Sequence, residues 1–128
     1  SCDASDDTDG KVTDASYSGD GNHASPEDAK KIARQLLAQY FPKDHGDDQW
    51  SALEKLWTRE SSWQWNATNA SSGAYGIPQS LPGDKMASVG KDWKDNAGTQ
   101  IKWGLQYIKQ RYGTPKDAWA HSESVGWY

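Results

Sequence analysis

The chain has 128 residues, which is enough for one domain and short for two, and only 34% of them are hydrophobic. Its net charge of −4 comes from the first 24 residues, which contain six aspartates and one lysine. The remainder is nearly neutral and has no basic cluster, which excludes a typical nucleic-acid-binding protein. No apolar run approaches the ~18–20 residues that a membrane span needs, and the single cysteine, Cys2, excludes an intramolecular disulfide.

Residues 1–24 are rich in Asp, Ser, Gly and Thr and contain few large apolar side chains. Such a composition buries too little apolar surface to offset the entropy lost when a chain becomes ordered. We therefore expect a disordered acidic tail over 1–24, followed by one folded domain over 25–128. Cys2 is interpreted either as the lipid-bearing cysteine of an exported protein or as a free thiol.

Two helices are predicted in the first half of the domain. The first begins at Pro26 with Ser25 as its N-cap, and its apolar residues recur at helical spacing as far as Tyr40. The second begins near residues 47–48 and runs to about residues 60–62, because its apolar residues follow the same period.

The segment 61–83 has a different composition, in which Ser, Asn, Gly and Ala dominate and aromatic residues are isolated. We expect a long ordered loop that includes a short hairpin. Long loops in compact domains are usually functional. A short helical turn is expected next, over 84–88.

A third main helix is predicted from Asn96, a good N-cap, to Gly113, which stops it. Gly104 costs about 1 kcal/mol inside a helix, so we expect another element to pack closely against it. A last short helix is capped by Thr114. The predicted fold class is therefore mainly α, a small helical domain with one extended loop.

Glu60 departs from the pattern of the second helix. It follows Trp57 by three residues and Leu56 by four, so its side chain falls on the apolar stripe. A carboxyl group beside tryptophan in a low-dielectric environment resists ionisation, which raises its pKa. A protonated carboxylic acid can act as general acid on a glycosidic oxygen. Taken alone, the position also fits an ordinary last-turn glutamate that faces Arg59 or solvent.

Three linked motifs follow one another: Glu60-Ser61 at a helix end, Gly-Ala-Tyr-Gly-Ile-Pro-Gln over 73–79, and a helix that opens with Asn96 and carries Gly104. Together they resemble the lytic transglycosylases of the lysozyme-like superfamily, and most of all the secreted actinobacterial and phage-tail branch. The resemblance implies a lysozyme-like α+β fold, mainly helical, whose extended loop binds substrate. It also implies cleavage of the MurNAc–GlcNAc bond of peptidoglycan to 1,6-anhydro ends, without a metal or organic cofactor.

The resemblance assigns roles to individual residues. Glu60 stands at the position of the single catalytic acid and base, Ser61 at that of a serine that supports the substrate, and Gln79 at that of a glutamine that hydrogen-bonds it. Tyr75 falls in the same wall of the site. His121 stands near the place of a family tyrosine, because the chain has Ala-Trp-Ala-His-Ser where the family has Ala-Tyr-Asn-Ala-Gly.

Eight tryptophans and six tyrosines offer flat amphipathic surfaces that suit sugars. Helical spacing predicts that three of the tryptophans lie in the core, namely Trp50, Trp57 and Trp119. Trp63 and Trp65 alternate in the loop, so one of the two is expected to face the cleft. The aromatic residues that we assign to substrate binding are Trp63, Trp103, Tyr107 and the C-terminal Tyr128.

Two other functions are open on the sequence. A hydrolase acting on the same bond usually has a second carboxyl about 5–9.5 Å from the first. The candidates, each of which also fits a surface charge or a cap, are Asp84, Asp92 and Glu123. A glycan-binding module could keep the fold without the chemistry. In every case we expect peptidoglycan glycan strands as partner, an extracellular or wall-associated location and a monomer.

Overall fold

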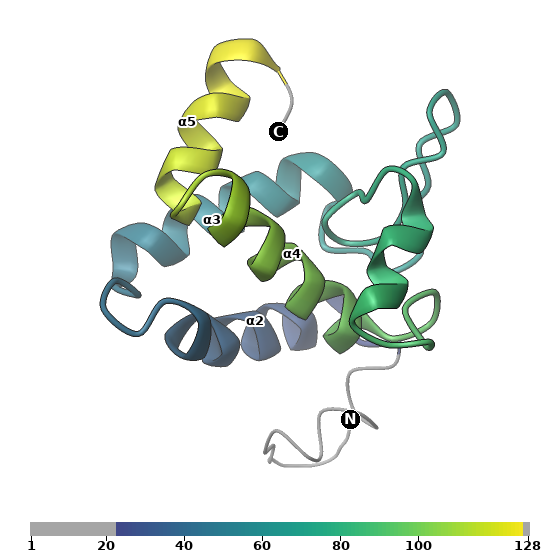
Figure 1. Cartoon of the computed structure of the whole chain (residues 1–128), viewed down its shortest axis with the longest axis horizontal. Helices are drawn as coiled ribbons and strands as arrows, with labels where there is room; N and C mark the ends of the chain where they lie inside the picture. Colours follow the sequence, from purple (N-terminus) through teal and green to yellow (C-terminus); the bar gives the residue numbers. More distant parts are fainter. Residues whose placement is uncertain (1–22, 127–128) are drawn as a thin grey trace.

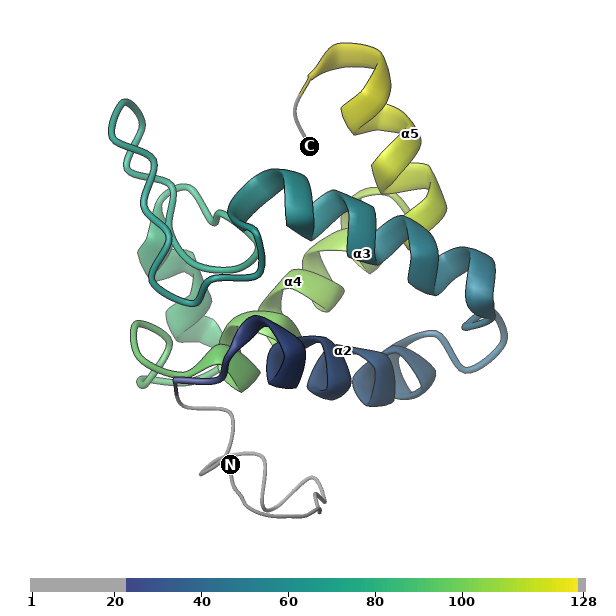
Figure 2. The same cartoon turned by 180° about the vertical axis from the view of Figure 1, so that it is seen from behind.

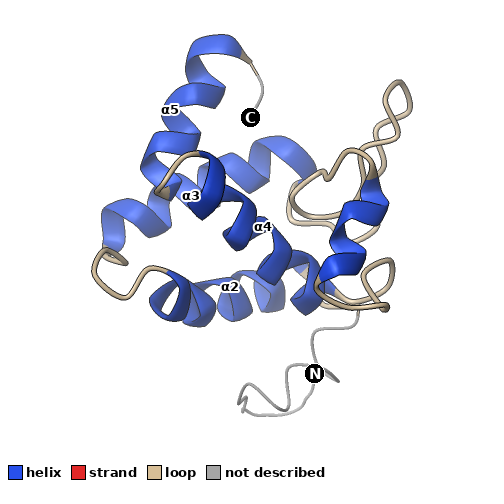
Figure 3. Ribbon diagram, in the orientation of Figure 1, coloured by secondary structure: helices blue, strands red, loops and turns tan. Residues whose placement is uncertain are grey.

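The computed structural model describes residues 23–126. Within this range the protein is mainly helical, as predicted, and Figure 3 shows helices joined by loops. The elements are α2 (Pro26–Tyr40), α3 (Asp47–Ser61), the short 3-10 helix η1 (Gly83–Ser88), α4 (Ala97–Arg111) and α5 (Pro115–Val125). None of these helices is long and apolar enough to cross a membrane.

The predicted caps set the beginnings of three helices. The Ser25 hydroxyl accepts a hydrogen bond from the Asp28 N–H, and the Thr114 hydroxyl accepts one from the Asp117 N–H, both at 3.2 Å. The Asn96 side chain accepts from the Gly98 N–H at 2.8 Å at the start of α4. Each bond satisfies a donor that the first turn of a helix leaves without a partner.

The helices pack in pairs around one core. α2 lies against α4 and α3 lies against α5, and α4 passes behind α2 and α3 in Figure 2. The residues at the centre of this core include Leu36 of α2, Leu53 of α3, Ile101 of α4 and Ala118 of α5. Trp57 is fully buried, while Trp50 and Trp119 are partly buried and pack against the core, which confirms the interpretation of these three tryptophans.

The loop 62–82 stands at one side of the helices in Figures 1 and 2. It folds back on itself through isolated antiparallel bridges that pair Tyr75 with Thr68 and with Ser80. Gly76 adopts a φ of +81°, and a Cβ there would come within 2.8 Å of the Gln100 side chain, so the turn requires glycine. The short hairpin expected in this segment is therefore confirmed.

The packed chain includes His23 and Ala24, two residues before the predicted boundary. The His23 ring stacks on Trp65 with centroids 3.9 Å apart, and Ala24 is part of the core. The rest of the predicted tail, with Cys2, lies outside the described residues, as does Tyr128.

Candidate functional site

Glu60 occupies the last turn of α3, one turn beyond the fully buried Trp57. Its side chain is half-buried, and burial raises the pKa of its carboxyl group; the positive charge of Arg59 opposes this effect only in part. Among residues 23–126, no side chain pairs with the carboxylate or donates a hydrogen bond to it. Glu60 is thus a carboxyl that resists ionisation while it still meets solvent, which is what a general acid requires.

Arg59 is directed elsewhere. Its guanidinium donates a hydrogen bond to the Ser122 carbonyl oxygen at 3.2 Å and so joins α3 to α5. The Arg59 charge lowers the pKa of the Glu60 carboxyl group less than burial raises it, and no salt bridge joins the two side chains among residues 23–126. The interpretation of Glu60 as a last-turn glutamate that faces solvent stays open.

Ser61 connects the end of α3 to the loop. Its hydroxyl is buried, lies 2.7 Å from the Ile77 carbonyl oxygen and accepts a hydrogen bond from the Trp63 N–H at 3.2 Å. A hydroxyl held in this way fixes the backbone between α3 and the loop. The role of Ser61 in substrate binding stays a prediction.

Three elements meet at Gly104 of α4. A Cβ at this position would come within 2.5 Å of Trp57 Cζ2 and 3.0 Å of Pro78 Cβ, so the helix backbone itself touches α3 and the loop. This confirms the close packing expected at Gly104. The contact draws together the segments that carry three of the candidate residues, Glu60, Gln79 and Trp103.

A small pocket lies between the loop and α4. Its lining includes Gln79, Trp103 and Tyr107, three of the predicted substrate-binding residues, and its volume is about 70 Å³. The rings of Trp103 and Tyr107 stack at 5.2 Å with an interplanar angle of 14°. Ligand pockets usually measure ~300–1,000 Å³, so this pocket is small for a binding site.

Gln79 is held rigidly in this pocket. Its backbone has a φ of +56°, and its Nε2 donates to the carbonyl oxygens of Gly76 at 2.9 Å and Ala67 at 3.0 Å. Because the amide nitrogen is used within the loop, the carbonyl oxygen Oε1 is the atom of Gln79 that suits an outside donor.

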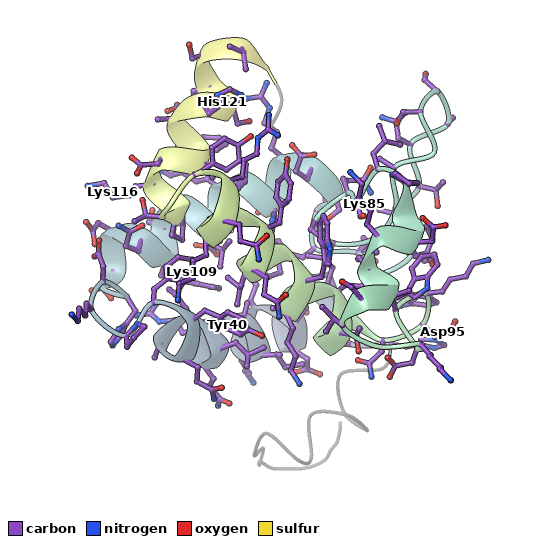
Figure 4. The ribbon with its side chains drawn as sticks, in the orientation of Figure 1. Tyr40, Lys85, Asp95, Lys109, Lys116 and His121 are labelled. Carbon is purple, nitrogen blue, oxygen red and sulfur yellow. The ribbon has the colours of Figure 1, made fainter. Side chains whose placement is uncertain are left out.

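His121 of α5 continues the aromatic surface. Its ring lies 5.1 Å from that of Tyr112, which lies 6.1 Å from Tyr107, so Trp103, Tyr107, Tyr112 and His121 form one row of rings. In Figure 4 His121 is seen high on α5. Burial, followed by the neighbouring Tyr107, raises the pKa of the Tyr112 hydroxyl. Tyr112 follows the last residue of α4, and nothing in the sequence around it predicts this contact.

Trp63 and Tyr75 do not belong to this surface. Trp63 is 1% exposed, packs edge-on against Trp57 and donates from Nε1 to the Glu54 carbonyl oxygen, so its assignment to substrate binding is wrong. The Trp63 ring is part of the core because the chain folds back against α3 immediately after Ser61. Tyr75 donates from its hydroxyl to the Lys94 carbonyl oxygen at 2.8 Å and does not line the pocket.

Gln100, to which the sequence pattern assigned no role, connects α4 to the backbone of the loop. It is fully buried; its Oε1 accepts from the Ile77 N–H at 3.0 Å, and its Nε2 donates to the carbonyl oxygens of Trp65 and Trp93, both at 2.9 Å. One signal could have found it: Gln100 lies four residues before Gly104, on the face of the helix that packs against other elements.

The candidate second carboxyls have the surroundings of a helix cap or of surface charges. Asp92 accepts hydrogen bonds from the side chains of Asn96 and Thr99, both at 2.8 Å, and so supports the start of α4. Asp84 and Glu123 are exposed. In the described part of the chain, no group of three or more His, Cys, Asp or Glu residues could hold a metal ion.

Comparison with known proteins finds no matching family model, curated protein or solved structure. The surroundings of Glu60, and the pocket lined by Gln79, Trp103 and Tyr107, are therefore the basis for a functional conclusion.

Proposed function

We propose that the chain is a peptidoglycan lytic transglycosylase in which Glu60 acts first as acid and then as base. The observation that carries this proposal is the state of Glu60: a half-buried carboxyl with a raised pKa and with no ion pair or hydrogen bond among residues 23–126. Perturbed carboxyls without a structural partner are concentrated at catalytic sites.

The proposed reaction needs one carboxyl. Glu60 protonates the glycosidic oxygen between MurNAc and GlcNAc, the bond from C1 to that oxygen breaks, and the N-acetyl group of MurNAc assists the departure. The carboxylate of Glu60 then takes the proton of the 6-hydroxyl while O6 bonds to C1. A 1,6-anhydro ring forms, Glu60 recovers its proton, and no water is consumed.

The arrangement of the motifs supports this proposal. The Glu-Ser pair, the loop that ends at Gln79 and the helix that carries Gly104 are the segments that resemble the lytic transglycosylases, and they are in contact through Trp57, Gly104 and Pro78. The stacked Trp103 and Tyr107 present aromatic surface next to this contact, and such rings suit the apolar faces of sugars.

Hydrolysis of the same bond is the main competitor. Hydrolases usually place a second carboxyl about 5–9.5 Å from the first. Asp92 is engaged with Asn96 and Thr99, and Asp84 and Glu123 lie exposed on other elements, which favours a single-carboxyl mechanism. A wall substrate implies that the protein acts outside the cytoplasmic membrane, and we propose that it does so as a monomer on glycan strands.

The test is digestion of purified sacculi followed by mass spectrometry of the soluble products. The wild type should release muropeptides with 1,6-anhydro ends, and Glu60→Gln should lower the rate by at least about a hundredfold, since general acid–base catalysis contributes ~10²–10⁴-fold. Glu54→Gln is the matched control, because it makes the same change on the same helix and removes only a partly exposed ion pair with Lys30.

Each other outcome has a definite meaning. Products with reducing ends would show a hydrolase. Unchanged turnover in Glu60→Gln would remove Glu60 from the mechanism. Glycan binding by the wild type without any cleavage would identify a non-catalytic module.

A further inference from the structure

The pocket beside Gln79 has a cation at its edge. Lys85 of η1 lines it together with Trp103, Tyr107 and the largely exposed Leu81, and Figure 4 shows Lys85 at this element. The pocket thus combines an ammonium group, two aromatic rings and an apolar contact. A neutral sugar would use the rings, the apolar contact and at most a hydrogen bond from the ammonium to a hydroxyl oxygen, whereas a carboxylate would also neutralise its charge.

The fold fixes the backbone that carries Lys85. Met86, the next residue, is fully buried, and the Lys85 N–H donates to the Pro82 carbonyl oxygen at 3.2 Å. Gly83, at the start of η1, packs so closely that a Cβ there would lie 3.0 Å from Tyr75 Cβ and 3.2 Å from the Trp93 ring. The exposed ammonium therefore projects from a well-supported turn.

The charge of Lys85 is not neutralised within the described part of the chain. No carboxylate there lies within salt-bridge distance of its ammonium, although other basic residues are paired: Lys30 with Glu54, Arg34 with Asp47 and Lys116 with Asp48. The adjacent Asp84 does not line the pocket. A cation beside aromatic surface attracts an anion, and a charge-assisted hydrogen bond is stronger than a neutral one.

We propose that Lys85 binds a carboxylate borne by the muramyl unit of the glycan, so that the pocket distinguishes muramyl strands from neutral polymers of GlcNAc. This inference rests on the proposed function and names the part of the substrate that the pocket recognises. The carboxylate belongs either to the lactyl group of a peptide-free unit or to the peptide stem attached to it. In both cases the Lys85 ammonium group pairs with a carboxylate carried by the muramyl unit.

The experiment measures binding in the Glu60→Gln background, where turnover does not interfere, by titration calorimetry. Three ligands are compared: a neutral GlcNAc tetramer, a peptide-free GlcNAc–MurNAc tetrasaccharide, and the same tetrasaccharide with peptide stems. Lys85→Gln should weaken binding of a carboxylate-bearing ligand about five- to tenfold and leave the neutral tetramer within about twofold. Lys85→Arg should restore binding, and the exposed Lys55→Gln on α3 is the matched control.

The ligand that responds identifies the source of the carboxylate, the lactyl group or the stem. The effect should shrink when ionic strength rises from about 0.05 to about 0.5 M, because salt screens a partly exposed pair. An equal loss for the neutral tetramer, no loss for any ligand, or no binding of any ligand would overturn the inference. Cleavage of sacculi by the wild type is measured separately, so failure of the proposed activity is distinguishable from failure of this binding role.

Discussion

Glu60 shows how a single residue can oppose the stability of the helix on which it lies. Its carboxyl group is half-buried one turn beyond Trp57, and no described side chain compensates for the water that it loses. Helical spacing alone predicted this position, because a residue three or four places after buried ones shares their face. Trp63 was assigned from the alternation of two tryptophans in a loop, where side chains follow no fixed period, and that assignment failed because the ring is buried.

Glu60→Gln should be more thermally stable than the wild type at neutral pH. Burial raises the folded-state pKa of Glu60. The stabilisation that protonated Glu60 gives the folded state is therefore complete below the unfolded-state pKa and is lost as pH rises through the folded-state pKa. Glutamine does not ionise and avoids this loss. Scanning calorimetry across pH should therefore show a higher Tm for the variant near pH ~7 and converging values below pH ~4.

Glu54→Gln, which removes an exposed carboxyl of the same helix, should change stability by no more than about 0.5 kcal/mol. A Tm of Glu60→Gln equal to or below that of the wild type at neutral pH would contradict the account of a partnerless carboxyl.

At the scale of elements, the helices could be predicted from residues close together in the chain, whereas the shape of the loop could not. Ser25, Asn96 and Thr114 marked the beginnings of α2, α4 and α5, because a cap acts on donors only two or three residues away. The loop was predicted to be non-helical, but its shape depends on Gln100, whose side chain bonds to a residue 23 positions earlier. A local sequence pattern cannot predict a hydrogen bond between residues so far apart in the chain.

Gln100→Glu should destabilise the protein by about 2–4 kcal/mol at neutral pH. A carboxylate there would face the carbonyl oxygens of Trp65 and Trp93 without a hydrogen to donate, and a buried acceptor left unpaired is costly. Acidification should recover part of the loss, because a protonated carboxyl can donate to one of the two oxygens. Urea unfolding at pH ~4 and ~7 would measure both effects.

Gln110→Glu makes the same substitution at an exposed position of α4 and serves as the control. If Gln100→Glu were as stable as this control at neutral pH, the buried amide would not be what holds the loop in place.

On the scale of the whole molecule, one core unites the four α-helices of the described region and the loop. Leu36, Leu53, Ile77, Ile101 and Ala118 belong to the same buried cluster, although they come from α2, α3, the loop, α4 and α5. The candidate site lies where three of these elements touch. Its geometry therefore depends on the integrity of the entire core.

Unfolding should accordingly be a single cooperative transition. Far-UV circular dichroism reports the helices, and tryptophan fluorescence sums over the eight tryptophans, which include the packed pair of Trp57 and Trp63. The two signals should give the same midpoint in urea, because neither region has a core of its own. An earlier fluorescence transition would mean that the loop separates from the helices before they unfold.

The amino-acid sequence by itself determined the helices, their caps and the apolar position of Glu60, since these depend on residues within one or two turns of each other. Only the tertiary structure decided that Ser61 binds the Ile77 carbonyl, that Trp63 is buried, and that Gln79 shares a pocket with Trp103 and Tyr107. These contacts join residues that are far apart in the chain or lie in loops without periodicity. They form only when α3, the loop and α4 come together at Gly104.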